Sequence, residues 1–210
     1  MHRSGSRFAA ANGSSSKREA IEEAALQTFY ERGYQGASIR AIAGQAGTAV
    51  ANIFHYFPSK QSILEEIVNG AANRMQAEID QALGGLVDPV ERLTAATATM
   101  VTASCVRQRE VFVAQSEFRS LSPPAFMVNR EKRRRIQSTF AELVAAGVRE
   151  GRFDERQPNG IARSVVLLSS AVANWFEPGH GLTVEEVADS HVEMALRLVG
   201  CPLATGARVC

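Results

Sequence analysis

Four polar side chains in the segment from residue 45 to residue 64, QAGTAVANIFHYFPSKQSIL, are of types that bind a polyanion. Asn52 can form two hydrogen bonds with an adenine edge, and the rings of His55 and Tyr56 can donate to phosphate oxygens. Lys60 adds a positive charge at an expected helix start, where free backbone amides favour anions. The alternative is that His55 and Tyr56 are half-buried aromatic residues near a helix end.

Two short helices are expected to position these side chains. Ser38 can cap a helix over residues 39–46, which Gly47 would end. A second helix is expected from Thr48 or Ala49 to residue 56, because the residue before Pro58 avoids the helical region. Two short helices joined by a tight glycine-containing turn are typical of a helix-turn-helix, whose second helix enters the major groove of DNA.

The spacing within the second helix separates a buried face from an exposed one. Ile53 and Phe57 are four residues apart and can share a core with Ile42. Asn52, His55 and Tyr56 then project from other faces of the helix. The pattern therefore predicts a nucleic-acid contact on an exposed helix face.

Helix signals also dominate the rest of the chain, which shows no convincing β-alternation. The fold class expected is all-α, with about nine helices. Residues 1–15 are expected to be a disordered arm, and SKRE at 16–19 reads as a capping box that starts the first helix. DPVE at 88–91 is expected to start another helix, and SPP at 122–124 to start one that stops near Gly151. Two more are expected, from Pro158 through Trp175 and from a TVEE capping box at 183–186 to about Val199.

Composition argues against several classes of protein. Residues 1–60 carry seven Lys and Arg against four acids, while the remaining 150 residues carry sixteen against eighteen. A basic N-terminal part is compatible with a DNA-binding head. Three widely spaced cysteines without a CxxC pair indicate reduced thiols, and no segment approaches the ~20 apolar residues of a membrane span. Catalytic and metal-binding motifs are absent from the sequence, so neither an enzyme nor a cofactor is expected, and the location expected is cytoplasmic.

Residues 17–64 resemble the N-terminal domain of the TetR family of bacterial transcriptional regulators. The resemblance rests on FYERGYQGASIRAIAGQAG followed by IFHYFPSKQSIL, which is similar to the family's aromatic-aromatic-x-Phe-x-Ser-Lys signature. It implies a helix-turn-helix DNA-binding domain over residues 16–62, a helical ligand-binding and dimerisation domain over 63–200, and a tail over 201–210.

The resemblance also implies roles for individual residues. Ser38 would cap the second helix of the domain and touch phosphate, and Arg40 would lie near the DNA backbone. Three residues would face bases (Thr48, Ala49, Asn52), and three would grip phosphates (His55, Tyr56, Lys60).

Three residues depart from the family pattern. Ala49 stands where a capping Ser is frequent, so Thr48 is expected to cap one residue earlier. Phe54 replaces a frequent Tyr and loses one phosphate contact. Val50 occupies a position that is often basic, which favours apolar contact with thymine methyl groups.

The C-terminal domain is expected to supply a dimer interface and a ligand pocket. One stripe of apolar residues is expected at the interface (Ile161, Val165, Leu168, Val172, Trp175), although such a stripe could also be intramolecular core. Three residues of the middle helices are expected to line the pocket, or otherwise to be core (Met100, Phe112, Phe118). Segments 121–153 and 174–189 resemble family members that sense acyl-CoA thioesters or other lipid-like catabolites.

The basic run KRRR at 132–135 leaves two interpretations. It could clamp the phosphates of a coenzyme A moiety, or it could be a solvated helix face compensated by Glu131. Four consecutive residues span more than one helical turn, so they cannot all point into one pocket.

Together these features predict a homodimeric repressor that holds a palindromic DNA operator and is released by a small hydrophobic ligand, with an acyl-CoA thioester as the implied class and no membrane partner. The rival interpretation is a helical small-molecule carrier whose head no longer reads DNA, which Ala49, Val50 and Phe54 favour.

Overall fold

The computed structural model describes residues 5–154 and 157–202, with side chains from residue 16 on. Helices account for all the regular structure in these ranges, and the all-α prediction is confirmed. The described residues form nine α-helices and two short 3-10 helices: α1 (Gly5–Gly36), α2 (Ile39–Gln45), α3 (Val50–Tyr56), α4 (Lys60–Ala82), α5 (Pro89–Val106), α6 (Gln108–Ser116), η1 (Phe118–Ser120), α7 (Pro123–Arg149), α8 (Pro158–Ala171), η2 (Val172–Asn174) and α9 (Val184–Leu198).

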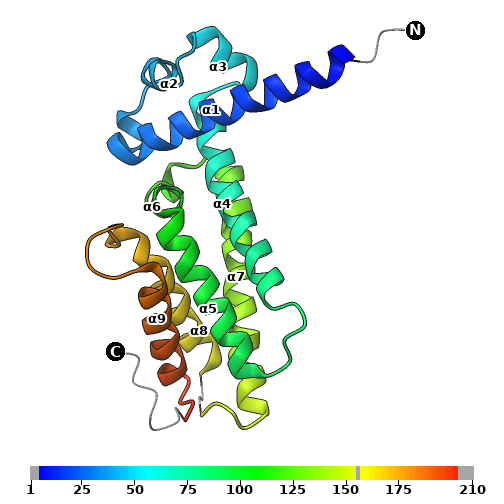
Figure 1. Ribbon diagram of the computed structural model, residues 1–210, viewed down its shortest axis with the longest axis vertical. Coiled ribbons are helices and arrows are strands. Elements are labelled where there is room, and N and C mark those ends of the chain that lie inside the picture. Colours follow the sequence, from blue (N-terminus) through cyan, green and yellow to red (C-terminus); the bar gives the residue numbers. More distant parts are fainter. Residues whose placement is uncertain (1–4, 155–156, 203–210) are drawn as a thin grey trace.

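A small head formed by α1, α2 and α3 sits on an elongated helical body, and α4 runs from one into the other (Figure 1). The first half of α4 buries Ile63 and Leu64 in the head core, while its second half buries Met75 and Ile79 in the body core. A helix of this length spans about 34 Å. The predicted domain boundary between residues 62 and 63 therefore lies inside a continuous helix.

Most predicted helix starts are confirmed by the caps. Ser59 begins α4 and Asp88 begins α5, and the oxygen of each side chain accepts a backbone amide hydrogen. Thr183 and Glu186 form the expected capping box at the start of α9. These short polar signals act locally, and they therefore survive in the folded protein.

The start of the first helix was predicted wrongly. α1 begins at Gly5, so Ser16 and Glu19 lie inside the helix and do not start it, whereas disorder of residues 1–15 stays a prediction. Extending an existing helix needs no new nucleus, and the segment contains no proline to stop it. Residues 1–4, and residues 203–210 of the predicted tail, lie outside the described ranges.

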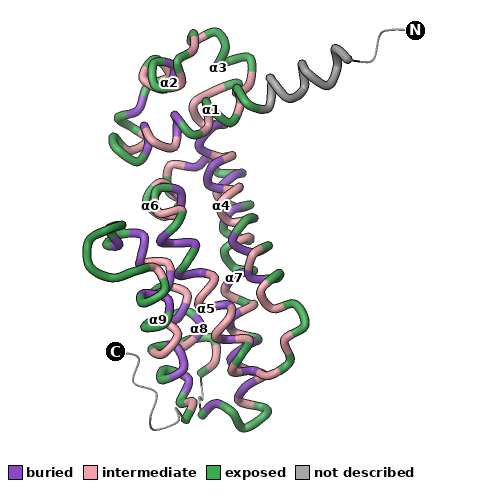
Figure 2. Tube along the Cα trace, viewed as in Figure 1, coloured by how far each residue is buried: buried purple, intermediate pink, exposed green. Residues whose placement is uncertain are grey.

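Buried residues occur in both the head and the body (Figure 2), and their contacts group them into a head core and a body core. The head core joins α1–α4 to residues of α6 and α7, among them Val113 and Ala125. The body core gathers side chains of α4, α5, α7, α8 and α9 around Phe140 and Leu93. No helix in the described ranges has the length and hydropathy that crossing a membrane would require.

Candidate nucleic-acid interface

The head core holds α3 in a fixed orientation. Ile42, Ile53 and Phe57 are all buried, as the spacing predicted. Between α2 and α3 the chain turns at Gly47, whose φ of 60° is a conformation that favours glycine. The amide of Thr48 donates to the carbonyl of Ala43 at 3.0 Å, which closes the C-terminal turn of α2.

Asn52 lies on the exposed face of α3 and is hydrogen-bonded to Thr48. The amide nitrogen of its side chain donates to the hydroxyl oxygen of Thr48 at 3.0 Å. Thr48 does not cap α3, contrary to prediction. The N-cap is the exposed Ala49, which forms no side-chain hydrogen bond, and α3 itself begins at Val50. The threonine therefore orients Asn52 instead of capping the helix.

His55 and Tyr56 lie at the end of α3 beside α1. Their rings meet edge to face with centroids 5.0 Å apart. Together with Asn52 they line a hollow of about 170 Å³ between α1 and α3. Lys17 of α1 lines the same hollow and is exposed, which the sequence analysis missed because only the tertiary fold brings α1 against α3.

Ser38 and Arg40 lie at the start of α2. The hydroxyl oxygen of Ser38 accepts the amide hydrogen of Ala41 at 3.1 Å, which confirms Ser38 as the helix cap. Its own hydroxyl hydrogen remains available to a phosphate. Arg40 is exposed two residues further on. Phe54, the departure noted on α3, is 51% exposed.

The Lys60 side chain binds to backbone groups of the head. Its ammonium donates to the backbone carbonyls of Tyr34 at 2.7 Å and Ala37 at 2.8 Å, and it lies 4.2 Å from the centroid of the Tyr34 ring. The lysine thereby fixes the chain that leaves α1 to the start of α4. Its position favours a role in holding the head together, and the phosphate contact stays a prediction.

Two family models match the chain. One, described as bacterial regulatory proteins of the tetR family, matches residues 21–67, which include the whole helix-turn-helix. The other, described as a tetracyclin repressor-like C-terminal domain, matches residues 86–199, more than half of the chain. The chain belongs to the TetR family. Members of this family are DNA-binding transcriptional regulators. They have a helix-turn-helix head and a helical C-terminal domain.

Known TetR-family proteins are similar to this one over most of its length. The HTH-type transcriptional repressor KstR2 of Mycolicibacterium smegmatis is 24% identical, covering 86% of this chain and 89% of its own. A solved tetR-family regulatory protein from Rhodococcus RHA1 is 28% identical with a TM-score of 0.83, covering 88% and 97%. AibR, solved with isovaleryl coenzyme A and operator DNA, is 23% identical with a TM-score of 0.78, covering 88% of this chain and 99% of its own. This similarity is one of fold.

The three predicted pocket residues are not brought together. Met100 is buried in the body core, whereas Phe112 and Phe118 pack against the head core. Phe112 meets Tyr30 edge to face, with centroids 5.2 Å apart. Helical spacing does not distinguish two separate cores from one cavity, so a shared ligand pocket of these residues stays a prediction.

The predicted interface stripe divides into two faces. Val165 and Val172 are buried within the subunit, so as interface residues they were predicted wrongly, and Ile161 is half-buried against the body core. Leu168 and Trp175 are 44% and 49% exposed. Leu167 of α8 is exposed as well, as are Met194 and Leu198 of α9, and the Trp175 ring stacks on His191 of α9 with centroids 6.2 Å apart.

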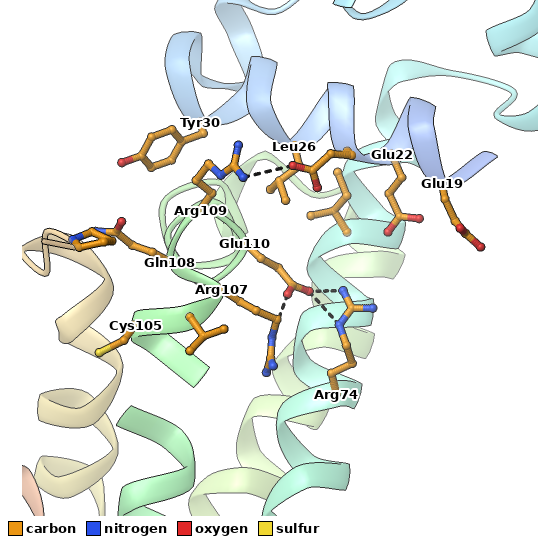
Figure 3. Close-up of a pocket in the computed structure, with 14 residues that line it drawn as sticks. Glu19, Glu22, Leu26, Tyr30, Arg74, Cys105, Arg107, Gln108, Arg109 and Glu110 are labelled. Atoms are coloured by element: carbon orange, nitrogen blue, oxygen red, sulfur yellow. Dashed lines mark hydrogen bonds and ion pairs between the residues drawn. The ribbon is translucent and has the colours of Figure 1, made fainter. Parts of the chain in front are cut away.

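A cleft of about 660 Å³ lies where the head meets the body, between α1, α4 and α6 (Figure 3). Glu110 is buried beneath it and is held by Arg74 at 3.1 Å and by Arg107 at 3.3 Å. Arg109 reaches Glu23 of α1 at 3.3 Å. Each arginine lining the cleft thus has a carboxylate partner, and the ion pairs connect α6 to the head and to α4.

Glu22 is the carboxylate of this cleft that the fold disfavours. Burial raises its pKa, and the negative charge of Glu66 raises it further, while Arg18 at 3.9 Å opposes the shift. A carboxyl whose pKa is higher in the folded protein than in the unfolded chain destabilises the fold once it is ionised.

We expect Glu22→Gln to raise the melting temperature by roughly 1–2 °C at pH 7. The gain should vanish as the pH falls below about 4, the pKa of an unfolded glutamate, because both proteins are then uncharged at this position. Circular dichroism melts between pH 3.5 and 7.5 measure this. Glu23→Gln is the control, since Glu23 pairs with Arg109 and should give no gain.

Proposed function

We propose that this TetR-family protein is a homodimeric, cytoplasmic repressor that holds a palindromic operator in the absence of ligand. The observation that carries the proposal is the exposed face of α3, where Thr48 orients the amide of Asn52 over a core that fixes the helix. Such an amide can pair with an adenine edge in the major groove. Ser38, Arg40, His55, Tyr56 and Lys17 stand around it as candidate phosphate contacts.

Exposed apolar side chains on α8, on α9 and at Trp175 support the dimer. Leu167, Leu168 and Trp175 are large apolar side chains that water surrounds in the single subunit. A second copy would cover them and would supply a second head. Two heads about 34–36 Å apart match successive major grooves on one side of DNA.

The ligand proposed is a small hydrophobic molecule of the acyl-CoA thioester class. The related KstR2 is described as a ketosteroid transcriptional regulator, and AibR has been solved with isovaleryl coenzyme A and operator DNA. A ligand releases DNA only if it binds more tightly to a state in which the two heads are wrongly spaced. Titrating isovaleryl and octanoyl coenzyme A into the operator complex tests this part, and retention of DNA at saturating thioester would contradict it.

Asn52→Ala should weaken operator binding by about 1–3 kcal/mol, because one base pair in each half-site loses its hydrogen-bonding partner. Binding to random DNA should stay nearly unchanged, since phosphate contacts remain. Competition titrations with operators mutated one base pair at a time measure this loss. Equal weakening on operator and random DNA would show that Asn52 does not read a base.

A further inference from the structure

A groove follows the seam between α4 and α7 on the body, away from the head and its cleft. It consists of two adjoining hollows of about 420 and 200 Å³, which share Gln76, Asp80 and Arg135. Arg92 of α5 lines the larger hollow, and Lys132 of α7 lines the smaller one. We refer to these five residues and the space between them as the α4–α7 groove.

The basic run at 132–135 is divided by the helix between different surroundings. Lys132 and Arg135, three residues apart, both line the groove. Arg133 lies 4.9 Å from the centroid of the Phe118 ring, and Arg134 is 77% exposed with Glu131 4.0 Å away. Only half of the run can therefore act in the groove, and Arg134 provides an internal comparison.

The groove carries positive charge that the described residues do not neutralise. Arg135 pairs with Asp80 at 3.5 Å. Arg92 and Lys132, by contrast, have no carboxylate within ion-pair distance in the described part of the chain, and Glu142 is the only other acid lining either hollow there. The only hydrogen-bond partner of the Lys132 ammonium in this part is the Asn69 carbonyl, at 3.5 Å.

Two buried polar atoms of the groove also lack partners among the described residues. Gln76 is 8% exposed, and its amide nitrogen donates to Asp80 at 2.7 Å, but its carbonyl oxygen accepts nothing. The Nε–H of Arg92 is likewise buried and donates to nothing. Unsatisfied buried groups are costly, and both residues line the larger hollow, so a ligand bound there that draws these two atoms into contact would supply the missing partners.

We propose that the α4–α7 groove binds a phosphate-bearing anion. The guanidinium of Arg92 carries the N–H donors that bind phosphate oxygens, and Lys132 adds a second cation. The free carbonyl oxygen of Gln76 can accept a hydroxyl or amino hydrogen from the remainder of the ligand. A nucleotide or the coenzyme half of a thioester combines these groups, whereas inorganic pyrophosphate offers the phosphates alone.

A coenzyme A thioester, the ligand class of the proposed function, carries such phosphates. Anion binding in the groove does not depend on the proposed function, whereas an effect of that binding on DNA release does. Gln76 and Asp80 stand on α4, the helix whose other end lies in the head core. A ligand that draws α4 and α7 together would act on a rigid helix continuous with the head. Binding in the groove and release of DNA can be measured separately.

Isothermal titration calorimetry of the full chain without DNA tests the site, with pyrophosphate, ADP and coenzyme A as probes. At least one probe should bind, and Arg92→Gln and Lys132→Gln should each weaken binding about tenfold, as loss of a charged hydrogen bond does. Arg134→Gln removes the same charge two residues from Lys132 and should leave affinity unchanged. Equal affinity for all three probes would mean that only phosphate is recognised, and tighter binding of ADP and coenzyme A would add the Gln76 contact.

Absence of binding by every probe would overturn the proposal, as would a loss for Arg134→Gln equal to that for Arg92→Gln. Lys132→Gln keeps the test valid if Arg92→Gln does not fold, because among the described residues the Lys132 ammonium has one long hydrogen bond, to the Asn69 carbonyl. The same probes are then added to the operator complex. Binding in the groove without release of DNA would confirm the site and refute ligand control through it.

Discussion

Phe57→Ala should destabilise the head by about 3–5 kcal/mol and abolish DNA binding. Phe57 is 1% exposed and fills the head core together with Ile42 and Ile53, and the guanidinium of Arg18 lies 4.7 Å from its ring centroid. Removing the ring leaves a cavity under α3, and the helix loses the surface that orients its exposed face. Circular dichroism melts and anisotropy with operator DNA measure the two effects.

Phe54→Ala is the matched control for Phe57→Ala. Phe54 lies three residues earlier, on α3 itself, and is 51% exposed, so its removal opens no cavity. Its stability should stay within about 0.5 kcal/mol of the parent protein. A comparable loss of stability in both variants would contradict the assignment of Phe57 as the core residue that holds α3.

Lys60→Met should lower the stability of the head by about 2–4 kcal/mol, because two backbone carbonyls lose a charged donor. These are the carbonyls of Tyr34 and Ala37, where the chain passes from α1 to α2. Methionine keeps most of the side-chain length and therefore isolates the loss of the ammonium. DNA binding should fall for every sequence, in proportion to the fraction of unfolded head, as measured by melting and by anisotropy.

Lys17→Met separates this structural role from a phosphate contact. Lys17 is exposed beside α3, so its loss should leave the melting temperature unchanged. The dependence of log affinity on log salt should become shallower by about one unit per subunit, as for any phosphate-contacting lysine. The reverse pattern, a shallower slope for Lys60→Met with no loss of stability, would assign the phosphate contact to Lys60 alone.

The helix-turn-helix could be predicted from the sequence because residues close to each helix end determine where that helix begins or ends. Ser38, Gly47 and Pro58 act within a few residues of their own position, and each begins or ends a helix where expected. The internal role of Lys60 could not be predicted in this way. Its partners lie 23 and 26 residues away, and only the packed head brings them within reach.

The body was less predictable, because apolar spacing on a helix does not identify what covers each face. Val165 and Leu168 belong to one heptad stripe, yet the first is buried and the second is exposed. The helix also gives way to a 3-10 turn after Ala171, which changes the direction of Trp175. The division of the basic run between groove, aromatic ring and solvent likewise depends on where α4 packs against α7.

The most direct test of the account is fluorescence anisotropy of the purified protein with DNA from immediately upstream of its own gene. Scrambled DNA of the same length is the comparison, and both are titrated at two salt concentrations. A head that reads bases should bind tightly to the upstream DNA only, and this binding should weaken steeply as salt rises because phosphate contacts are lost. Equal, weak binding to both DNAs, and to operators selected from random sequence, would contradict a head that reads bases and would favour a helical small-molecule carrier.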